Sequence, residues 1–171
     1  SLVRGRGAHE GQWLLLFNIG SWARKGWGMA VADSLEPLRQ GTNPFRLGKP
    51  YPLLKGTGGE NAPNDFVAYG GIWYAPDESR QGGPGMWSSP DLETWTNHGK
   101  IKGMNGHDPG MCFDGERYYL FNEYRKGLRY CSAMHPLGPY TPHGVAFETG
   151  SHCGDADVCF FNNRWHITFD D

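Results

Sequence analysis

Four aspartates precede short apolar segments that resemble one another, and carboxyl groups in such a set could do acid–base chemistry. They are Asp65, Asp108, Asp155 and Asp157. Where carboxyl groups gather in one pocket, their repulsion lets one stay protonated near neutral pH while another is ionised. One group can then donate a proton while another accepts one. Asp155 and Asp157 lie two residues apart, so on a regular strand both would face the same side.

Three further polar residues lie close to these acids. His107 and His152 stand shortly before two of the acids, and Glu123 follows an aromatic segment. A histidine there could bind a hydroxyl group, tune an acid or hold a metal ion, and an ordinary surface histidine explains it equally well. Glu123 is a candidate acid, although we favour a solvated strand end.

The acids also have structural alternatives. Asp65 follows Pro63 and Asn64, and Asp108 lies in a Gly-His-Asp-Pro-Gly run, so both stand in good turn sequences. We favour a pocket role for both. For Asp108 the reason is that it holds the same position as Asp155 in an internal repeat of the sequence. The aspartates interpreted as turn residues only are Asp33, Asp91 and Asp114.

The elements that would position the acids form an internal repeat. Each of three copies runs from an acid through a short apolar strand and a tight turn into an aromatic strand. The turn pairs are Gly70-Gly71, Asp114-Gly115 and Asn162-Asn163, residue types that tolerate the positive φ of two-residue hairpin turns. An incomplete copy precedes them at residues 9–17.

A third and a fourth strand are expected after each of the first three hairpins. Four strands per unit, repeating every ~40–60 residues, are typical of β-propeller blades. No segment has a sustained helical period, so no substantial helix is expected. We predict an all-β fold with about three and a half four-stranded antiparallel blades, in a single domain over residues 1–171. The expected ranges are 28–37, 85–95 and 128–139 for the third strands, and 45–47, 98–101 and 144–147 for the fourth.

Composition agrees with this fold and excludes some functions. Aromatic residues make up 14% of the chain, beside 26 Gly and 12 Pro, which favours many short strands. With 16 Lys and Arg against 18 Asp and Glu, nothing indicates an electrostatic nucleic-acid binder. The longest clean apolar run, residues 13–17, has the length of a strand and not of a membrane span.

The four cysteines are Cys112, Cys131, Cys153 and Cys159. They lack the spacing of a metal site. We expect buried thiols rather than two disulfides, because most lie beside aromatic or Met residues in strand-like runs. The compartment stays open, with an extracellular or periplasmic location slightly favoured.

On three motifs the chain resembles the five-bladed β-propeller glycoside hydrolases, the grouping of families 43, 32, 62, 68 and 117. Residues 85–95 (GMWSSPDLETW) are similar to a strand of that grouping that ends in S-x-D-L-x-x-W. Residues 62–65 (APND) are similar to its second-blade A-P-D motif, and residues 107–119 resemble a D-P-x-x-x-x-D-G-x-x-Y-Y blade start. The resemblance covers essentially the whole chain.

The chain departs from that grouping in two respects. A five-bladed ring needs more chain, and residues 1–3 look like the strand that follows a first-blade Asp-Pro, so we expect a fragment without the first-blade Asp. The acid of family 43 is commonly a Glu in E-G-P, whereas residues 152–157 read HCGDAD. The acid could be Asp155 or Asp157, or the chain could belong with relatives of family 117, which cleave anhydrogalactose from agar oligosaccharides.

The resemblance implies a glycoside hydrolase acting on plant or algal saccharides of arabinose, xylose, fructose or agar type. One carboxylic acid would protonate the leaving oxygen, and a second carboxylate would activate water or attack the sugar carbon. The catalytic candidates are Asp65, Asp108, Asp155 and Asp157, with their roles undivided. Flat faces for sugar rings could come from Trp22, Trp27, Trp73 and Trp87, and packing between blades explains each as well.

The resemblance implies no redox or nucleotide cofactor and leaves room for a channel-bound metal ion such as calcium. The expected partner is an oligosaccharide or polysaccharide, with neither nucleic acid nor membrane. Two alternatives stay open. One is a non-catalytic carbohydrate-binding propeller, because fold does not fix function. The other is an assembly of fragments that close the ring by pairing their exposed strand edges.

Overall fold

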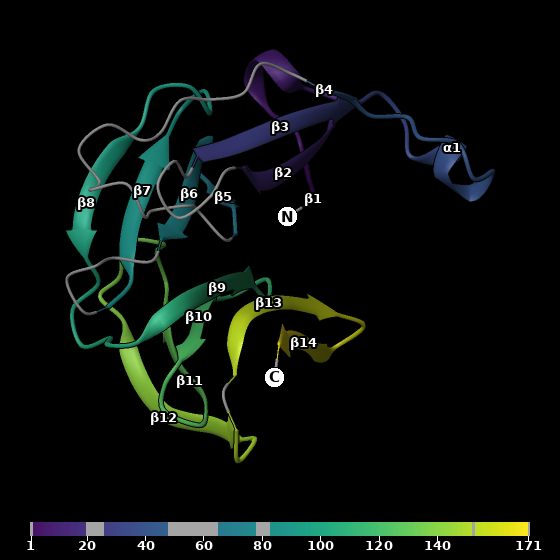
Figure 1. Cartoon of the computed structure of the whole chain (residues 1–171). Helices are drawn as coiled ribbons and strands as arrows, with labels where there is room; N and C mark the ends of the chain where they lie inside the picture. Colours follow the sequence, from purple (N-terminus) through teal and green to yellow (C-terminus); the bar gives the residue numbers. More distant parts are fainter. Residues whose placement is uncertain (1, 20–25, 48–64, 78–82, 152, 171) are drawn as a thin grey trace.

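The structure consists of antiparallel sheets that follow one another along the chain like the blades of a propeller (Figure 1). It is a computed structural model that describes residues 2–19, 26–47, 65–77, 83–151 and 153–170. Among these residues, three sheets have four strands each and the last has two. The all-β fold class, with about three and a half blades, is therefore confirmed.

Strands succeed one another within each blade in chain order. Blade 1 holds β1 (Leu2–Arg4), β2 (Trp13–Ile19), β3 (Gly26–Ala32) and β4 (Arg46–Leu47). Blade 2 holds β5 (Val67–Tyr69), β6 (Ile72–Asp77), β7 (Gly85–Ser89) and β8 (Thr96–Lys100). Blade 3 holds β9 (His107–Phe113), β10 (Tyr118–Glu123), β11 (Gly127–Ala133) and β12 (Thr141–Glu148). Blade 4 holds β13 (Gly154–Phe161) and β14 (Arg164–Asp170).

In Figure 1, β8 and β12 lie on the outside of blades 2 and 3, and β5 and β9 on the inside. The only helical turns described are η1 (Gly7–His9) and the four-residue α1 (Glu36–Arg39). No helix in the described part of the chain is long and apolar enough to cross a membrane.

Two of the three predicted two-residue turns are confirmed. Gly70 and Gly71 have φ of 58° and 81°, and Asn162 and Asn163 have φ of 52° and 56°. Each pair joins two strand residues that face each other directly across the hairpin. Positive φ at both central residues gives a turn whose twist matches that of the strands.

The third predicted turn is wrong in length. Phe113 pairs with Tyr118, so four residues, 114–117, make the connection. The Asp114 carboxylate accepts the backbone N–H groups of Glu116 and Arg117, each at 2.8 Å. A side chain that satisfies two backbone donors stabilises a longer turn than the Asp-Gly pair alone predicts.

Neighbouring blades enclose apolar clusters, which supply the hydrophobic stabilisation of the fold. The cluster between blades 1 and 2 includes Leu14, Leu16 and Trp73. The next, between blades 2 and 3, is built around Met111 and Leu120, and a third lies between blades 3 and 4. The innermost strands of blades 2 and 3 thus have an apolar cluster on either side.

The S-x-D-L-x-x-W motif forms a hydrogen-bonded turn. The Asp91 carboxylate accepts the N–H groups of Glu93 (2.8 Å) and Thr94 (2.7 Å), and Ser89 Oγ accepts that of Leu92 (2.8 Å). The Trp95 indole N–H donates to the Leu92 carbonyl at 3.1 Å. Leu92 is thereby held, fully buried, in the cluster between blades 1 and 2. The interpretation of Asp91 as a turn residue is confirmed.

Asp91→Ala should lower the free energy of unfolding by about 1 kcal/mol at pH 7, as loss of a side-chain cap does elsewhere. Hydrogen bonding, first from the Thr94 N–H, lowers the pKa of Asp91. Its stabilisation is therefore present above the ordinary pKa of about 4 and is lost as pH falls through the lowered value. Urea titrations at pH 7 and pH 3 should show the difference from wild type shrinking at the lower pH.

Glu93→Ala is the matched control for Asp91→Ala, because it removes an exposed carboxylate but keeps the N–H that Asp91 accepts. It should cost much less than Asp91→Ala at pH 7. An Asp91→Ala deficit that is the same at both pH values would contradict a role for the ionised carboxylate.

Candidate active site

Asp108 lies in a β-bulge of the innermost strand of blade 3. The pairing of β9 with β10 resumes at His107, opposite Glu123, so Asp108 and Pro109 together oppose the single residue Asn122. Asp108 has a φ of 47°, the left-handed region that Asp enters more readily than most residues. Bulges redirect side chains, and many are found beside active sites.

Asp155 lies in the equivalent bulge of blade 4. The pairing of β13 with β14 shifts between Gly154 and Asp157, so Asp155 and Ala156 oppose Phe169 alone. The bulge interrupts the alternation of the strand. The expectation that Asp155 and Asp157 face the same side therefore loses its premise. The backbone of Asp155 is described, and its side chain lies outside the described residues.

The two bulges are neighbours across the boundary between blades 3 and 4. Strand β13 packs directly against β9. A Cβ atom on Gly110 would collide with the carbonyl oxygen of Ala156 and would lie 3.1 Å from Val158 Cγ2. Gly110 is two residues beyond Asp108, and Ala156 directly follows Asp155. The close contact therefore brings the backbones of the two acids into one region. This supports the prediction that Asp108 and Asp155 hold the same position in the repeat.

Asp157 is placed differently. It is a regular member of the strand ladder, paired with Thr168, and it is exposed. Ala156 and Val158, on either side of it, are buried in the cluster between blades 3 and 4. Of the two adjacent candidates in blade 4, Asp155 has the position that corresponds to Asp108.

Asp65 joins blade 2 to blade 3. It lies just before β5, its side chain is buried, and its Oδ2 accepts the Met111 backbone N–H at 2.8 Å. Met111 is in β9, directly after Gly110. The next residue, Phe66, packs in the cluster between blades 1 and 2 and meets Trp95 edge to face. Asp65 thus lies between innermost strands, as a pocket acid would, and also has a clear structural role.

The four cysteines are free thiols in the structure, and the expected burial is confirmed for three of them. Cys112, Cys131 and Cys153 are buried, whereas Cys159 is exposed. Burial raises the pKa of Cys112 to about 11, with smaller contributions that include the nearby Asp65 charge. A thiol with such a pKa stays protonated near neutral pH and is a poor nucleophile, so Cys112 belongs to the packing of β9 and not to the candidate chemistry.

The two described tryptophan candidates are core residues. Trp73 and Trp87 are each only 3% exposed. Trp73 packs between blades 1 and 2, and the Trp87 indole N–H donates to Asp77 Oδ2 at 2.6 Å. Their burial favours the alternative of packing between blades over sugar stacking. Trp22, His152 and the side chain of Trp27 lie outside the described residues.

His107 and Glu123 are cross-strand partners at the end of the β9–β10 hairpin where Asp108 lies. His107 is exposed and Glu123 is half-buried. Both therefore stand beside the bulge, where a substrate group held near Asp108 could meet them. Within the described ranges, no three His, Cys, Asp or Glu side chains come together as a metal site would require.

Sequence reasoning missed two buried polar residues at the same end of the blades, Asp77 and Asn122. Asp77 ends β6 as Glu123 ends β10, and it is 1% exposed. Asn122 is fully buried opposite the Asp108 bulge. When the second strands of the repeat are aligned starting from their turns, Asp77 falls at the same position as Glu123. That correspondence would have made Asp77 a candidate.

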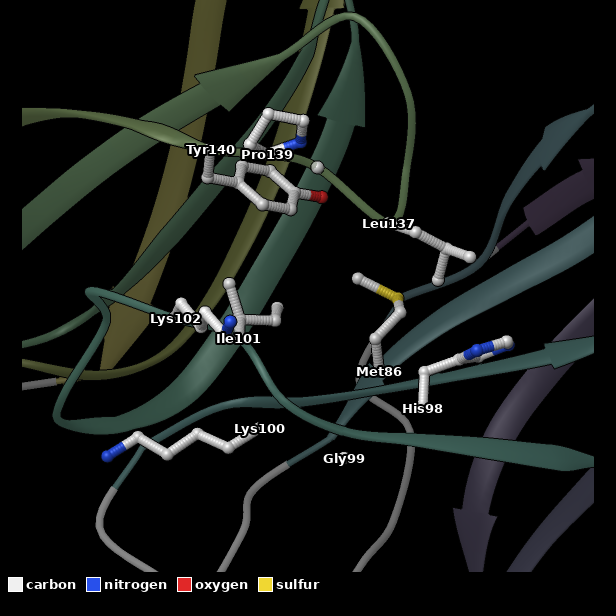
Figure 2. Close-up of a pocket in the computed structure, with 10 residues that line it drawn as sticks. Met86, His98, Gly99, Lys100, Ile101, Lys102, Leu137, Pro139 and Tyr140 are labelled. Atoms are coloured by element: carbon white, nitrogen blue, oxygen red, sulfur yellow. The ribbon is translucent and has the colours of Figure 1, made fainter.

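A cleft of 530 Å³ lies elsewhere, between the outer part of blade 2 and blade 3 (Figure 2). Met86, His98 and Lys100 line it from blade 2, and Leu137 and Tyr140 from blade 3. His98 bonds Ser88 Oγ through Nε2 at 2.7 Å, and burial lowers its pKa. None of the predicted acids lines this cleft, so it is separate from the candidate active site.

Solved structures of glycoside hydrolases share this fold. An α-L-arabinofuranosidase from Clostridium thermocellum superposes with a TM-score of 0.65 at 17% identity, over 99% of this chain and 59% of that one. An arabinanase from Bacillus subtilis gives 0.62 at 17% identity, over 97% and 62%. A GH43_1 enzyme from Xanthomonas citri, complexed with xylose, gives 0.62 at 18% identity, over 93% and 60%.

The chain thus has the β-propeller fold of family 43 glycoside hydrolases and spans less than two thirds of the length of these structures. No protein-family model and no curated protein matches the sequence. The recognised fold agrees with the resemblance drawn from the motifs.

Asp65→Ala should lower the free energy of unfolding by about 1–3 kcal/mol, because it leaves the buried Met111 N–H without its acceptor. Asp65→Asn keeps an oxygen of the same reach and should cost less. Urea unfolding gives the free energies, and hydrogen exchange at the Met111 amide should be faster in the Ala variant. Equal losses in the two variants would contradict a role for Asp65 as a hydrogen-bond acceptor.

Proposed function

We propose that the protein carrying this chain is a glycoside hydrolase in which Asp108 and Asp155 are catalytic carboxylates. The observation that carries the proposal is the pair of equivalent bulges, which place both acids at the same level of adjacent innermost strands. The shared fold with glycoside hydrolases supports it.

The chemistry requires two carboxyl groups in different protonation states. One, as an acid, protonates the oxygen of the leaving sugar, while the other activates a water molecule or attacks the sugar carbon. Separations of about 5 Å favour retention of configuration, and about 6.5–9.5 Å favour inversion. Asp65, which accepts the Met111 N–H of β9, would form part of the pocket wall, and a further acid from the first blade would complete the set.

The proposed substrates are plant polysaccharides containing arabinose or xylose. Similar structures are described as an arabinanase, an α-L-arabinofuranosidase and an enzyme complexed with xylose. His107 and Glu123, beside the Asp108 bulge, are suited to hydrogen-bond sugar hydroxyl groups.

A non-catalytic carbohydrate-binding propeller is the second candidate. The observation in its favour is the sequence of blade 4, where Cys-Gly-Asp-Ala-Asp (153–157) stands in place of the E-G-P that is common in family 43. A propeller that has lost its acid would keep its strands, its turns and its sugar contacts.

Asp108→Asn should lower turnover about 10²–10⁴-fold, the usual contribution of one acid–base group. The assay is release of reducing sugar from arabinan, xylan, fructan and agar oligosaccharides by the full-length protein. Asp155→Asn should have a similar effect. Glu116→Gln, at the exposed turn at the other end of β9, is the matched control and should leave turnover unchanged.

Two outcomes would contradict the proposal. Asp108→Asn with wild-type turnover would remove Asp108 from the chemistry. Absence of turnover on every substrate, with sugar binding retained in both wild type and variant, would establish the binding module instead.

A further inference from the structure

Asn122 is a fully buried polar residue opposite the bulge that carries Asp108. Its side-chain Nδ2 donates two hydrogen bonds, to the Asn105 carbonyl at 2.7 Å and to the Glu123 carbonyl at 2.9 Å. Asn105 is in the segment that leads into β9, and Glu123 ends β10. One amide thus ties together the two chain segments that meet beside the bulge.

These bonds lie next to the interruption of the β9–β10 ladder. Pro109, in the bulge, has no N–H to donate. The regular pairing between β9 and β10 is interrupted where Asp108 and Pro109 lie. The Asn122 amide ties the Asn105 carbonyl, three residues before Asp108 and ahead of β9, to the Glu123 carbonyl at the end of β10.

The segment leading into β9 fits closely over Asn122. Gly106 has a φ of 110°, and a Cβ atom on it would collide with the Glu123 carbonyl and with Asn122 Nδ2. Only glycine allows the backbone to pass at this distance. The path of the chain into Asp108 is therefore set by its contact with Asn122.

The bulge alone does not call for an asparagine. The equivalent bulge of blade 4, at Asp155 and Ala156, is opposed by Phe169. Asn122 also leaves its Oδ1 buried without a hydrogen-bond partner among the described residues, which lowers stability. A buried group that is costly and not demanded by the fold suggests a functional constraint.

We propose that Asn122 is a positioning residue for Asp108. By fixing residues 105 and 106, its amide sets the direction in which the Asp108 carboxylate projects into the pocket. This inference rests on the proposed function, because it assigns Asn122 a role only through a catalytic Asp108.

The test uses Asn122→Asp in the full-length protein, on the substrate found in the reducing-sugar assay. The variant has the same shape but presents an oxygen to the two carbonyls in place of the donor. We expect kcat to fall about 10–100-fold, as for other small displacements of catalytic groups, with little change in KM. The limb of the kcat pH profile that reports the reacting acid should also shift.

Two further variants keep the test decisive. Gly106→Ala displaces the same segment without changing Asn122 or adding a charge, so it should lower kcat and shift the pH profile even if Asn122→Asp fails to fold. Glu116→Gln, in the exposed turn at the other end of β9, leaves this segment untouched, so its kinetics should match wild type.

The outcomes separate this inference from the proposed function. If Asp108→Asn abolishes turnover while folded Asn122→Asp and Gly106→Ala keep the wild-type kcat and pH profile, Asn122 is structural only and the inference is overturned. If Asp108→Asn leaves turnover intact, the proposed function fails, and the inference fails with it. A lower melting temperature with an unshifted pH profile also overturns it.

Discussion

The close approach of strand β9 to strand β13 is the constraint on which the candidate site depends. It exists because Gly110 has no side chain where the Ala156 carbonyl lies against it. Any larger residue would separate blades 3 and 4 at their inner edge, and cores that are packed to this density do not absorb the change without strain. The two bulges, and with them Asp108 and Asp155, are neighbours only while that contact holds.

Strand β9 is held from its other side as well. Directly after Gly110, the Met111 N–H donates to the buried Asp65 carboxylate of blade 2, and the Met111 side chain packs in the cluster between blades 2 and 3. Consecutive residues of one strand are thus fixed by the two flanking blades. A group on such a strand keeps its geometry when substrate binds, which is what acid–base catalysis needs.

The sequence predicted the repeat well, because strands, turns and blades leave local signals. Gly70-Gly71 and Asn162-Asn163 are turns because those residues accept positive φ. The bulges were not predictable from residue patterns, since they arise from pairing between strands. For that reason the regular strand assumed between Asp155 and Asp157 is not present, and their facing the same side stays a prediction. Nor does sequence distinguish a Trp that packs between blades from one that meets a sugar, which is why Trp73 and Trp87 were ambiguous.

The bulge in blade 4 also bears on the proposal that Asp155 is a catalytic acid. Asp is one methylene shorter than the Glu common in family 43, so its carboxyl group stays closer to the backbone. The separation of the two carboxyl groups decides the course of the reaction, so a shorter side chain requires the backbone to be displaced toward its partner. A bulge displaces the backbone by bending its strand, and β13 has one at Asp155. On this argument the shorter acid and the bulge depend on each other. A Glu at position 155 would then need a more regular strand to place its carboxyl group at the same point.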